Sequence, residues 1–320
     1  MSLNQLAPMA AIMVLMAGTA QARPASCPTL DAFADFLALA DRTADMAQAD
    51  QVLAFNQDFV AHYAALYVPT AIGLSPGPRL DSLALKGLQT ARADPTQRAR
   101  HETLLRAVPA VSGRFARAFP DFRCDFPVYL APTFGQMDGA GREVAGRPAL
   151  VLGVDTIARF ETDEQLPVFL AHDMFHRYHF QAAGFSDDLA ERDLIWRTLW
   201  VEGLATYVSA RLNPDRPLAD ALLFPRDLEA QAAPLLPSLA QGIRQDLDRV
   251  DPAVFGLYFM GGDAQARKLG RPSRAGYYLG YRVAERLGAH RSLVQLAHLK
   301  GRALRREIDE ALIALSKPDR

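Results

Sequence analysis

The stretch LPVFLAHDMFHRYHFQA, residues 166–182, decides how this chain is interpreted, because it combines a long apolar helix pattern with an unusual concentration of histidine. Three of the seven histidines, His172, His176 and His179, lie in it, and Asp173 follows the first of them. On a helix, His172 and His176 are about 40° apart around the axis and about 6 Å apart along it, so both can bind one tetrahedral metal ion. His179 lies about 10.5 Å along the axis from His172. We therefore expect His179 to support the ligands from behind or to pack in the core.

A third ligand is predicted on the next long helix, IWRTLWVEGLATYV, where Glu202 is the single acid in an apolar stretch. Burying a carboxylate is costly unless it is paired or bound to a metal, so Glu202 completes a two-histidine, one-carboxylate zinc set. The alternative is a buried ion pair with Arg197 or Arg282. Gly203 would let another element approach closely. Thr206, one turn later, is placed to hydrogen-bond a ligand from behind.

Together, AHDMFH and WVEGLATYVS resemble the gluzincin metallopeptidases, in which His-Glu-x-x-His on one helix and a Glu on a later helix hold zinc. The chain is most similar to a bacterial group of predicted zinc-dependent proteases. Their pattern also runs from a strand similar to ALVLGVD to a late GYY-x-GY, here AGYYLGYRVAERLG. The resemblance covers roughly residues 125–290. It implies that His172, His176 and Glu202 bind zinc, with water in the fourth position.

Asp173 departs from this resemblance, because the family has Glu at that position as the general base. Aspartate withdraws the carboxylate by about 1.5 Å, and misplacement on that scale can cost about 10²-fold in rate. Three interpretations follow for hydrolysis. The site is adjusted so that Asp173 works, an extra water bridges the gap, or the protein binds zinc and hydrolyses peptides poorly or not at all. Alternatively, Asp173 only orients a histidine.

The GYYLGY motif supplies candidate donors for the developing oxyanion. Tyr277 and Tyr281 share a helical face, and Tyr278 points elsewhere. We expect Tyr277 or Tyr278 to take this role, and the alternative is that the rings are only packed. The gluzincin resemblance further implies that the strand near Val151 to Asp155 offers backbone groups to an extended substrate.

Residues 125–160 are expected to form two or three strands, because FPVYLAPTF and PALVLGVDTIARF are short apolar runs bounded by Pro and Gly. GQMDGAGREVAGR between them is predicted to be a loop. From residue 163 onward the pattern is helical. The histidine helix is expected to start after Thr162 as N-cap, or at Pro167.

Earlier in the chain, helical patterns cover 29–66, 81–93 and 96–118. We therefore predict an α+β fold, mostly helical, with a small antiparallel or mixed sheet preceding a zincin-like active-site helix. Residues 23–120 would form an N-terminal helical region and 121–320 a zincin-like metallopeptidase region. The alternative is one continuous domain.

Residues 1–22 read as a signal peptide, with an apolar run before Ala20-Gln21-Ala22 and cleavage expected after Ala22. The protein is then periplasmic or secreted, without stable membrane insertion once the signal is cleaved. Its net charge of −1 gives no indication of a nucleic-acid partner. In an oxidising compartment Cys27 and Cys124 would form a disulfide, and the alternative is two separate thiols.

These observations predict a secreted or periplasmic zinc metallopeptidase-like hydrolase that cleaves peptide bonds of a peptide or protein substrate with zinc-activated water, using Asp173 as the base. A second hypothesis is a catalytically weak or inactive zinc-binding protein that recognises a peptide or protein partner. A third is a helical envelope protein whose histidines bind no metal.

Overall fold

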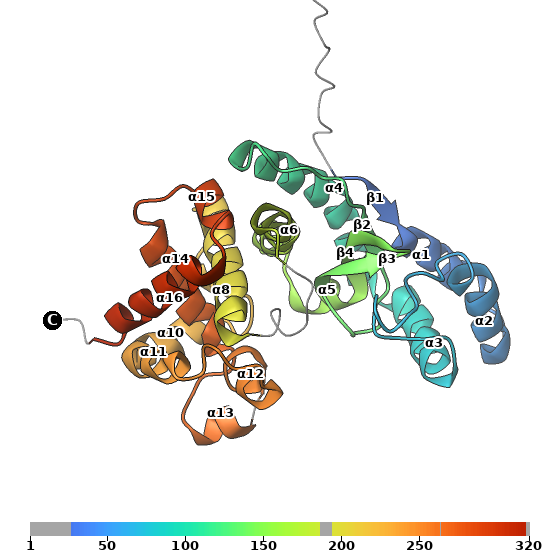
Figure 1. Cartoon of the computed structure of the whole chain (residues 1–320). Coiled ribbons are helices and arrows are strands. Elements are labelled where there is room, and N and C mark those ends of the chain that lie inside the picture. The colour runs from blue at the N-terminus through green and yellow to red at the C-terminus, as the bar shows by residue number, and fades with distance from the viewer. Residues whose placement is uncertain (1–26, 186–193, 263, 318–320) are drawn as a thin grey trace, which may run out of the picture.

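The computed structural model describes residues 27–185, 194–262 and 264–317, and the predicted signal peptide lies outside these ranges. The fold is α+β and mostly helical, with one small sheet, as the sequence predicts (Figure 1). None of the described helices is long and apolar enough to cross a membrane.

The sheet is mixed and has four strands in the order β1-β2-β4-β3. The strands are β1 (Thr29–Asp31), β2 (Val128–Ala131), β3 (Gly139–Val144) and β4 (Arg147–Gly153). β2 is parallel to both β1 and β4, and β3 is antiparallel to β4. β4 is a central strand whose residues from Ala149 to Gly153 are all buried, which explains its continuous apolar run, and β3 is an edge strand.

Three local predictions in this region are wrong. The segment GQMDGAGREVAGR is not only a loop, because β3 forms within it by pairing with β4 despite its glycines. The run PALVLGVDTIARF is a strand only as far as Gly153, and α5 (Val154–Phe160) follows directly. The 29–66 region begins with β1 rather than with a helix, because parallel pairing with β2 overrides the local pattern.

The helices that precede β2 confirm the predicted ones over 81–93 and 96–118 to within a few residues. They are α1 (Ala32–Arg42), α2 (Gln48–Ala54), the π-helical segment η1 (Phe55–Val60), α3 (Pro78–Ala93) and α4 (Pro95–Ala118). A proline begins both α3 and α4, where its missing N–H has no intrahelical partner to lose.

The remaining helices follow α5 in chain order. They are α6 (Leu166–Ala183), α8 (Ile195–Leu212), α9 (Leu218–Ala221), α10 (Leu228–Ala232), the 3-10 segment η2 (Ala233–Leu235), α11 (Leu236–Arg244), α12 (Pro252–Phe259), α13 (Ala264–Lys268), α14 (Ala275–Gly288), α15 (Leu293–Ala297) and α16 (Gly301–Leu315).

The histidine helix α6 is central: Figure 1 shows it end-on between the sheet and the C-terminal helices. It packs against α4, α8 and β3. Gln165 directly precedes α6, so Thr162 is not its N-cap, and Pro167 lies in the first turn. Gly184 ends the helix in the left-handed conformation, with φ of 59°.

Helices α8 and α14 touch backbone to backbone. A Cβ added to Gly203 of α8 would overlap the backbone of Gly280 in α14, and a Cβ added to Gly280 would overlap the backbone of α8. The close approach expected at Gly203 is therefore confirmed, with α14 as the partner. It brings the first turn of α14 next to Glu202.

The N-terminal region is joined to the sheet covalently and by packing. Cys27 and Cys124 form a disulfide, with their Cα atoms 5.0 Å apart. β1 pairs with β2, and α4 packs on α6. The helices before residue 120 therefore share a core with the rest of the described chain.

Candidate metal centre

Three side chains from two helices converge at the centre of the molecule. The Nε2 atoms of His172 and His176 are 3.0 Å apart. The Oε2 atom of Glu202 lies 3.5 Å from Nε2 of His172 and 3.6 Å from Nε2 of His176. The i, i+4 spacing on α6 aligns the two imidazoles, and the packing of α8 on α6 delivers the carboxylate.

These separations fit the edges of a tetrahedral metal site. With ligand distances of about 2.0 to 2.1 Å, two ligand atoms of a tetrahedral ion lie about 3.3 Å apart. The three observed distances bracket that value. The alternative ion pairs of Glu202 do not form in the described structure, because Arg282 contacts Glu285 and Arg197 lies over the Phe185 ring.

Asp173 adds a further potential ligand. One ligand atom from each of His172, Asp173 and His176 lies within 4.8 Å of the other two. This His-Asp-His group could hold a metal ion, and its donor atoms do not by themselves identify which metal.

Burial and mutual charge shift the protonation of this cluster. Burial lowers the pKa of His172. At His176 burial acts in the same direction, but the Glu202 carboxylate outweighs it and raises the pKa. Burial alone would raise the pKa of Glu202, but the two imidazoles hold it well below its usual range. Without a metal, these opposite shifts favour the ionised form of Glu202 and the protonated form of His176.

Asp173 lies against β3. A Cβ added to Gly139 would overlap Oδ2 of Asp173, so the carboxyl group needs a glycine at this point of the strand. Oδ2 is buried and accepts no hydrogen bond from the described residues. Burial raises the pKa of Asp173 to about 8, and the Asp138 carboxylate adds to the rise. With this pKa and no metal, the carboxyl group is mostly protonated at neutral pH, and it can act as a base only in its ionised form.

Of the candidate tyrosines, Tyr277 lies at the site. Its ring is nearly parallel to that of His172, with centroids 6.4 Å apart. Burial and the Glu202 carboxylate raise its pKa well above the usual value. Tyr278 is instead buried on another face of α14 and accepts a hydrogen bond from Arg282 at 3.1 Å. Tyr281 donates to Glu285. The geometry therefore selects Tyr277 over Tyr278.

The two residues expected to support the ligands from behind do not contact them through hydrogen bonds. His179 is fully buried and packs between the rings of Phe175 and Phe185, and neither of its ring nitrogens has a hydrogen-bond partner among the described residues. Thr206 donates to the backbone carbonyl of Glu202 at 2.9 Å, not to its carboxylate. His179 is thus a packing residue, and Thr206 acts within its own helix.

The cluster opens into a cleft of about 1560 Å³. The wall opposite α8 is the edge strand β3, where residues 138–143 line the cleft. This corrects the expectation for the strand near Val151 to Asp155: β4 is paired along both edges, with β2 and with β3, so the edge strand that lines the cleft is β3. The aromatic residues Phe160 and Phe224, 54% and 62% exposed, also line the cleft.

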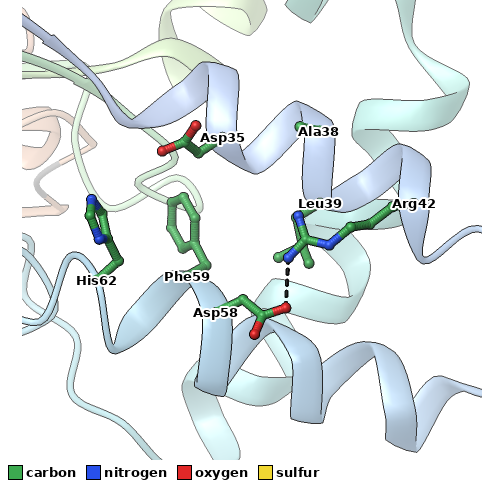
Figure 2. Close-up of a pocket in the computed structure, with 7 residues that line it drawn as sticks. All are labelled: Asp35, Ala38, Leu39, Arg42, Asp58, Phe59 and His62. Carbon is green, nitrogen blue, oxygen red and sulfur yellow. Dashed lines mark hydrogen bonds and ion pairs between the residues drawn. The ribbon is translucent and has the colours of Figure 1, made fainter.

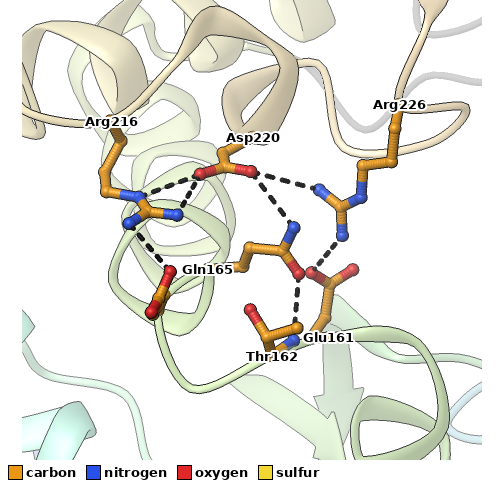
Figure 3. Close-up of polar contacts among 7 residues, drawn as sticks. Glu161, Thr162, Gln165, Arg216, Asp220 and Arg226 are labelled. Carbon is orange, nitrogen blue, oxygen red and sulfur yellow. Dashed lines mark hydrogen bonds and ion pairs between the residues drawn. The ribbon is translucent and has the colours of Figure 1, made fainter.

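A buried polar network holds a second part of the wall in place (Figure 3). Arg226 donates to Glu161 at 3.0 Å, and Gln165 donates to Asp220 at 3.1 Å. Arg216 binds Asp220 through two hydrogen bonds of 2.9 and 2.7 Å. The network joins the segment before α6 to the segment around α9, two parts of the chain that the sequence gives no reason to pair.

A smaller pocket of about 220 Å³ lies away from the cluster, between α1 and η1 (Figure 2). Its arginine, Arg42, is ion-paired with Asp58 at 2.7 Å, and Asp35 accepts a hydrogen bond from Tyr63. Arg42, Asp58 and Asp35 therefore already have partners within the protein, and we assign this pocket no ligand.

Comparisons with protein-family models, with curated proteins and with solved structures found no match to this chain. The geometry of the cluster and the resemblance of its motifs are therefore the observations that bear on the function of this protein.

Proposed function

We propose that this protein is a zinc-dependent, gluzincin-like hydrolase of peptide bonds. The observation that carries the proposal is the convergence of His172 Nε2, His176 Nε2 and Glu202 Oε2 within 3.0 to 3.6 Å of one another. Two histidines and one carboxylate form a ligand set found in catalytic zinc sites, which leave the fourth position open. The wide cleft above the cluster is consistent with an open position.

A zinc ion held by these three residues would supply Lewis-acid activation of water and of the peptide carbonyl. Side chains of the protein would supply proton transfer and stabilisation of the oxyanion. Asp173, with an unpartnered Oδ2 beside the cluster, would accept a proton from the attacking water and deliver it to the leaving amine. The Tyr277 hydroxyl, next to Glu202, would donate to the developing oxyanion.

The edge strand supports a peptide or protein as the substrate. β3 pairs with a neighbouring strand on one side only, and its residues 139–143 line the cleft. An extended peptide can add to such an edge through main-chain hydrogen bonds, which place a backbone carbonyl near the cluster. The balanced net charge of −1 gives no support to a nucleic-acid substrate.

We also propose that the mature protein is periplasmic or secreted. The leader pattern ending at Ala22 carries this proposal, and the Cys27–Cys124 disulfide supports it, because disulfides persist mainly in oxidising compartments. Radiolabelled or tagged protein recovered from the periplasm or medium, and starting after Ala22, is the expected result. Full-length protein in the cytoplasm would contradict it.

One observation favours a second function, zinc binding without efficient hydrolysis. Asp173 is shorter than the glutamate of the gluzincin pattern, and its carboxyl group is packed against Gly139. If it cannot reach the attacking water, the same cleft would recognise a peptide or protein partner without cleaving it.

Metal analysis of the purified mature protein tests the site. We expect about one zinc per chain, lost in His172→Ala and Glu202→Ala. His179→Phe is the matched control, since it removes a histidine of the same helix and should retain zinc. Absence of zinc from wild type after metal-replete purification would contradict the proposal.

Peptidase assays then separate the two functions. We expect Asp173→Ala to retain zinc and to lose about 10²- to 10⁴-fold in kcat/KM, the range of a general base. Equal activity of Asp173→Ala and wild type on every peptide would exclude the base role. Wild type that binds zinc and peptide but shows no cleavage would favour the second function.

A further inference from the structure

Arg274 lies at the entrance of α14 in a conformation that few residues other than glycine adopt. Its φ is 60°, and it is the residue directly before the first turn of the helix. The left-handed conformation costs roughly 1 kcal/mol for a residue with a Cβ. Such residues are concentrated at functional sites. Arg274 lines the cleft together with His172 and Glu202.

The Arg274 guanidinium is half-buried and has no anionic partner in the described parts of the chain. Its Cζ atom lies 4.0 Å from the centre of the Tyr277 ring. Its Nε atom is buried and makes no hydrogen bond to a described residue. A partly desolvated guanidinium without a hydrogen-bonding anion is unfavourable, and a bound carboxylate would relieve this.

Three other arginines of the cleft, Arg226, Arg142 and Arg159, are in a different situation. Arg226 pairs with Glu161 at 3.0 Å. Arg142 donates to the carbonyl oxygens of Ala71 and Gly141 at 2.8 and 3.0 Å. Arg159 is exposed, so water solvates its charge. Arg274 thus combines partial burial, a cleft position and a donor group without a partner.

The position of Arg274 relates it to the metal-binding cluster. The Tyr277 ring neighbours both groups, since its centre lies 4.0 Å from the Arg274 Cζ atom and 6.4 Å from the centre of the His172 ring. A peptide residue spans at most about 3.5 Å. An anion at Arg274 would therefore belong to a residue within about three positions of the bond that lies at the cluster.

We propose that Arg274 binds a carboxylate of the peptide substrate, close to the bond that is cleaved. This inference rests on the proposed peptidase function and names its substrate class. The planar fork of arginine matches a carboxylate through two parallel hydrogen bonds. The carboxylate is either the C-terminal α-carboxylate or the side chain of Asp or Glu, and the two sources are separated by the test.

The test uses the zinc-loaded protein and a set of fluorescent peptides of one sequence. One has a free C-terminus, one is C-terminally amidated, and a second pair carries Glu or Gln at an internal position. We expect wild type to prefer one carboxylate-bearing member about 10- to 100-fold in KM. Arg274→Gln should abolish that preference, and Arg274→Lys should retain part of it, because lysine keeps the charge without the fork.

Arg159→Gln is the matched control: it removes the same charge from the exposed rim of the same cleft and should leave the preference intact. Loss of the preference on amidation identifies the α-carboxylate, and loss on replacing Glu by Gln identifies the side chain. A wild type that does not discriminate within either pair overturns the inference. So does an Arg274→Gln variant that lowers kcat/KM equally for all four peptides, since Arg274 would then serve the reaction and not the carboxylate.

Equilibrium binding distinguishes failure of this inference from failure of the proposed function. Fluorescence anisotropy measures binding of the same peptides with no need for cleavage. A carboxylate preference that disappears in Arg274→Gln upholds the inference even if no peptide is hydrolysed. Hydrolysis without any such preference upholds the peptidase and overturns the carboxylate site. Absence of binding by all four peptides also overturns the carboxylate site, and it gives no support to the peptidase.

Discussion

At the residue scale, the spacing of α6 was sufficient to find the paired histidines, because i, i+4 periodicity is a local property. Glu202 was found because a lone acid in an apolar helix requires a partner. By contrast, Tyr277 and Tyr278 are adjacent in sequence, and only the packing of α14 on α8 separates their roles. Arg274 could not be identified from the sequence, because its proposed role depends on its left-handed backbone conformation and on its contact with the Tyr277 ring.

If the cluster holds zinc as proposed, the raised pKa of His176 predicts how the affinity for zinc depends on pH. Zinc binds the neutral imidazole, so His176 must lose the proton that the Glu202 carboxylate stabilises. We expect the affinity to increase by about tenfold per pH unit below the pKa of His176 and to level off above it.

Competition with a chelating dye between about pH 5.5 and 8 measures this dependence. His179→Phe should give the same profile as wild type. An affinity that does not change over this range would contradict the prediction.

At the scale of elements, long helices were predictable and the small strands were not. The patterns over 81–93 and 96–118 are strongly periodic, and α3 and α4 follow them. β3 is rich in glycine and forms only because β4 supplies hydrogen bonds, with Gly139 making room for Asp173. β1 has three residues, too few for periodicity to show, and its pairing partner β2 is almost a hundred residues away.

The contact between α8 and α14 should be intolerant of even one methyl group. We expect Gly203→Ala to reduce the free energy of unfolding by about 1 to 3 kcal/mol, because the added carbon overlaps the Gly280 backbone. It should also shift Tyr277 away from Glu202 and lower activity.

Chemical denaturation and kcat measurements check both effects. Gly261→Ala is the matched control, since a Cβ there meets no atom within 4 Å. Equal stability of Gly203→Ala and wild type would show that the helices separate without cost.

The start of α1 is held by Asp31. Its carboxylate accepts from the Ala34 N–H at 3.0 Å and contacts Nε2 of His101 at 2.8 Å. Burial opposes ionisation, but these two interactions outweigh it and hold the pKa of Asp31 below its usual value. Since the pKa is lower in the folded than in the unfolded protein, Asp31 stabilises the fold above the unfolded-state pKa, and this stabilisation is lost as pH falls through the folded-state value.

We therefore expect Asp31→Ala to cost about 2 kcal/mol at neutral pH, as loss of a cap and of a charged hydrogen bond. The difference from wild type should shrink below about pH 4. Urea unfolding at a series of pH values measures it, and a difference that grows on acidification would contradict the assignment.

At the scale of the whole molecule, the sequence left open whether residues 23–120 form a separate unit. The answer depends on tertiary contacts: β1 joins the sheet, α4 packs on α6, and the disulfide links Cys27 to Cys124. No composition change or linker near residue 120 could reveal these contacts, because each pairs segments that are distant in sequence.

Reduction should destabilise the protein substantially. The disulfide closes a loop with a sequence separation of 97, for which the chain-entropy model gives about 4 to 5 kcal/mol. We expect a lower urea midpoint in the presence of reductant. The double variant Cys27→Ser, Cys124→Ser should match reduced wild type and be insensitive to reductant, whereas an unchanged midpoint in wild type would contradict the prediction.

The same disulfide limits how this protein could be activated by proteolysis. A single cut anywhere between Cys27 and Cys124 leaves both fragments covalently joined, and β1 remains paired with β2. One such cut therefore does not release the helices in between as a propeptide. The cleft that leads to the candidate metal centre is already present in the intact, disulfide-bonded chain.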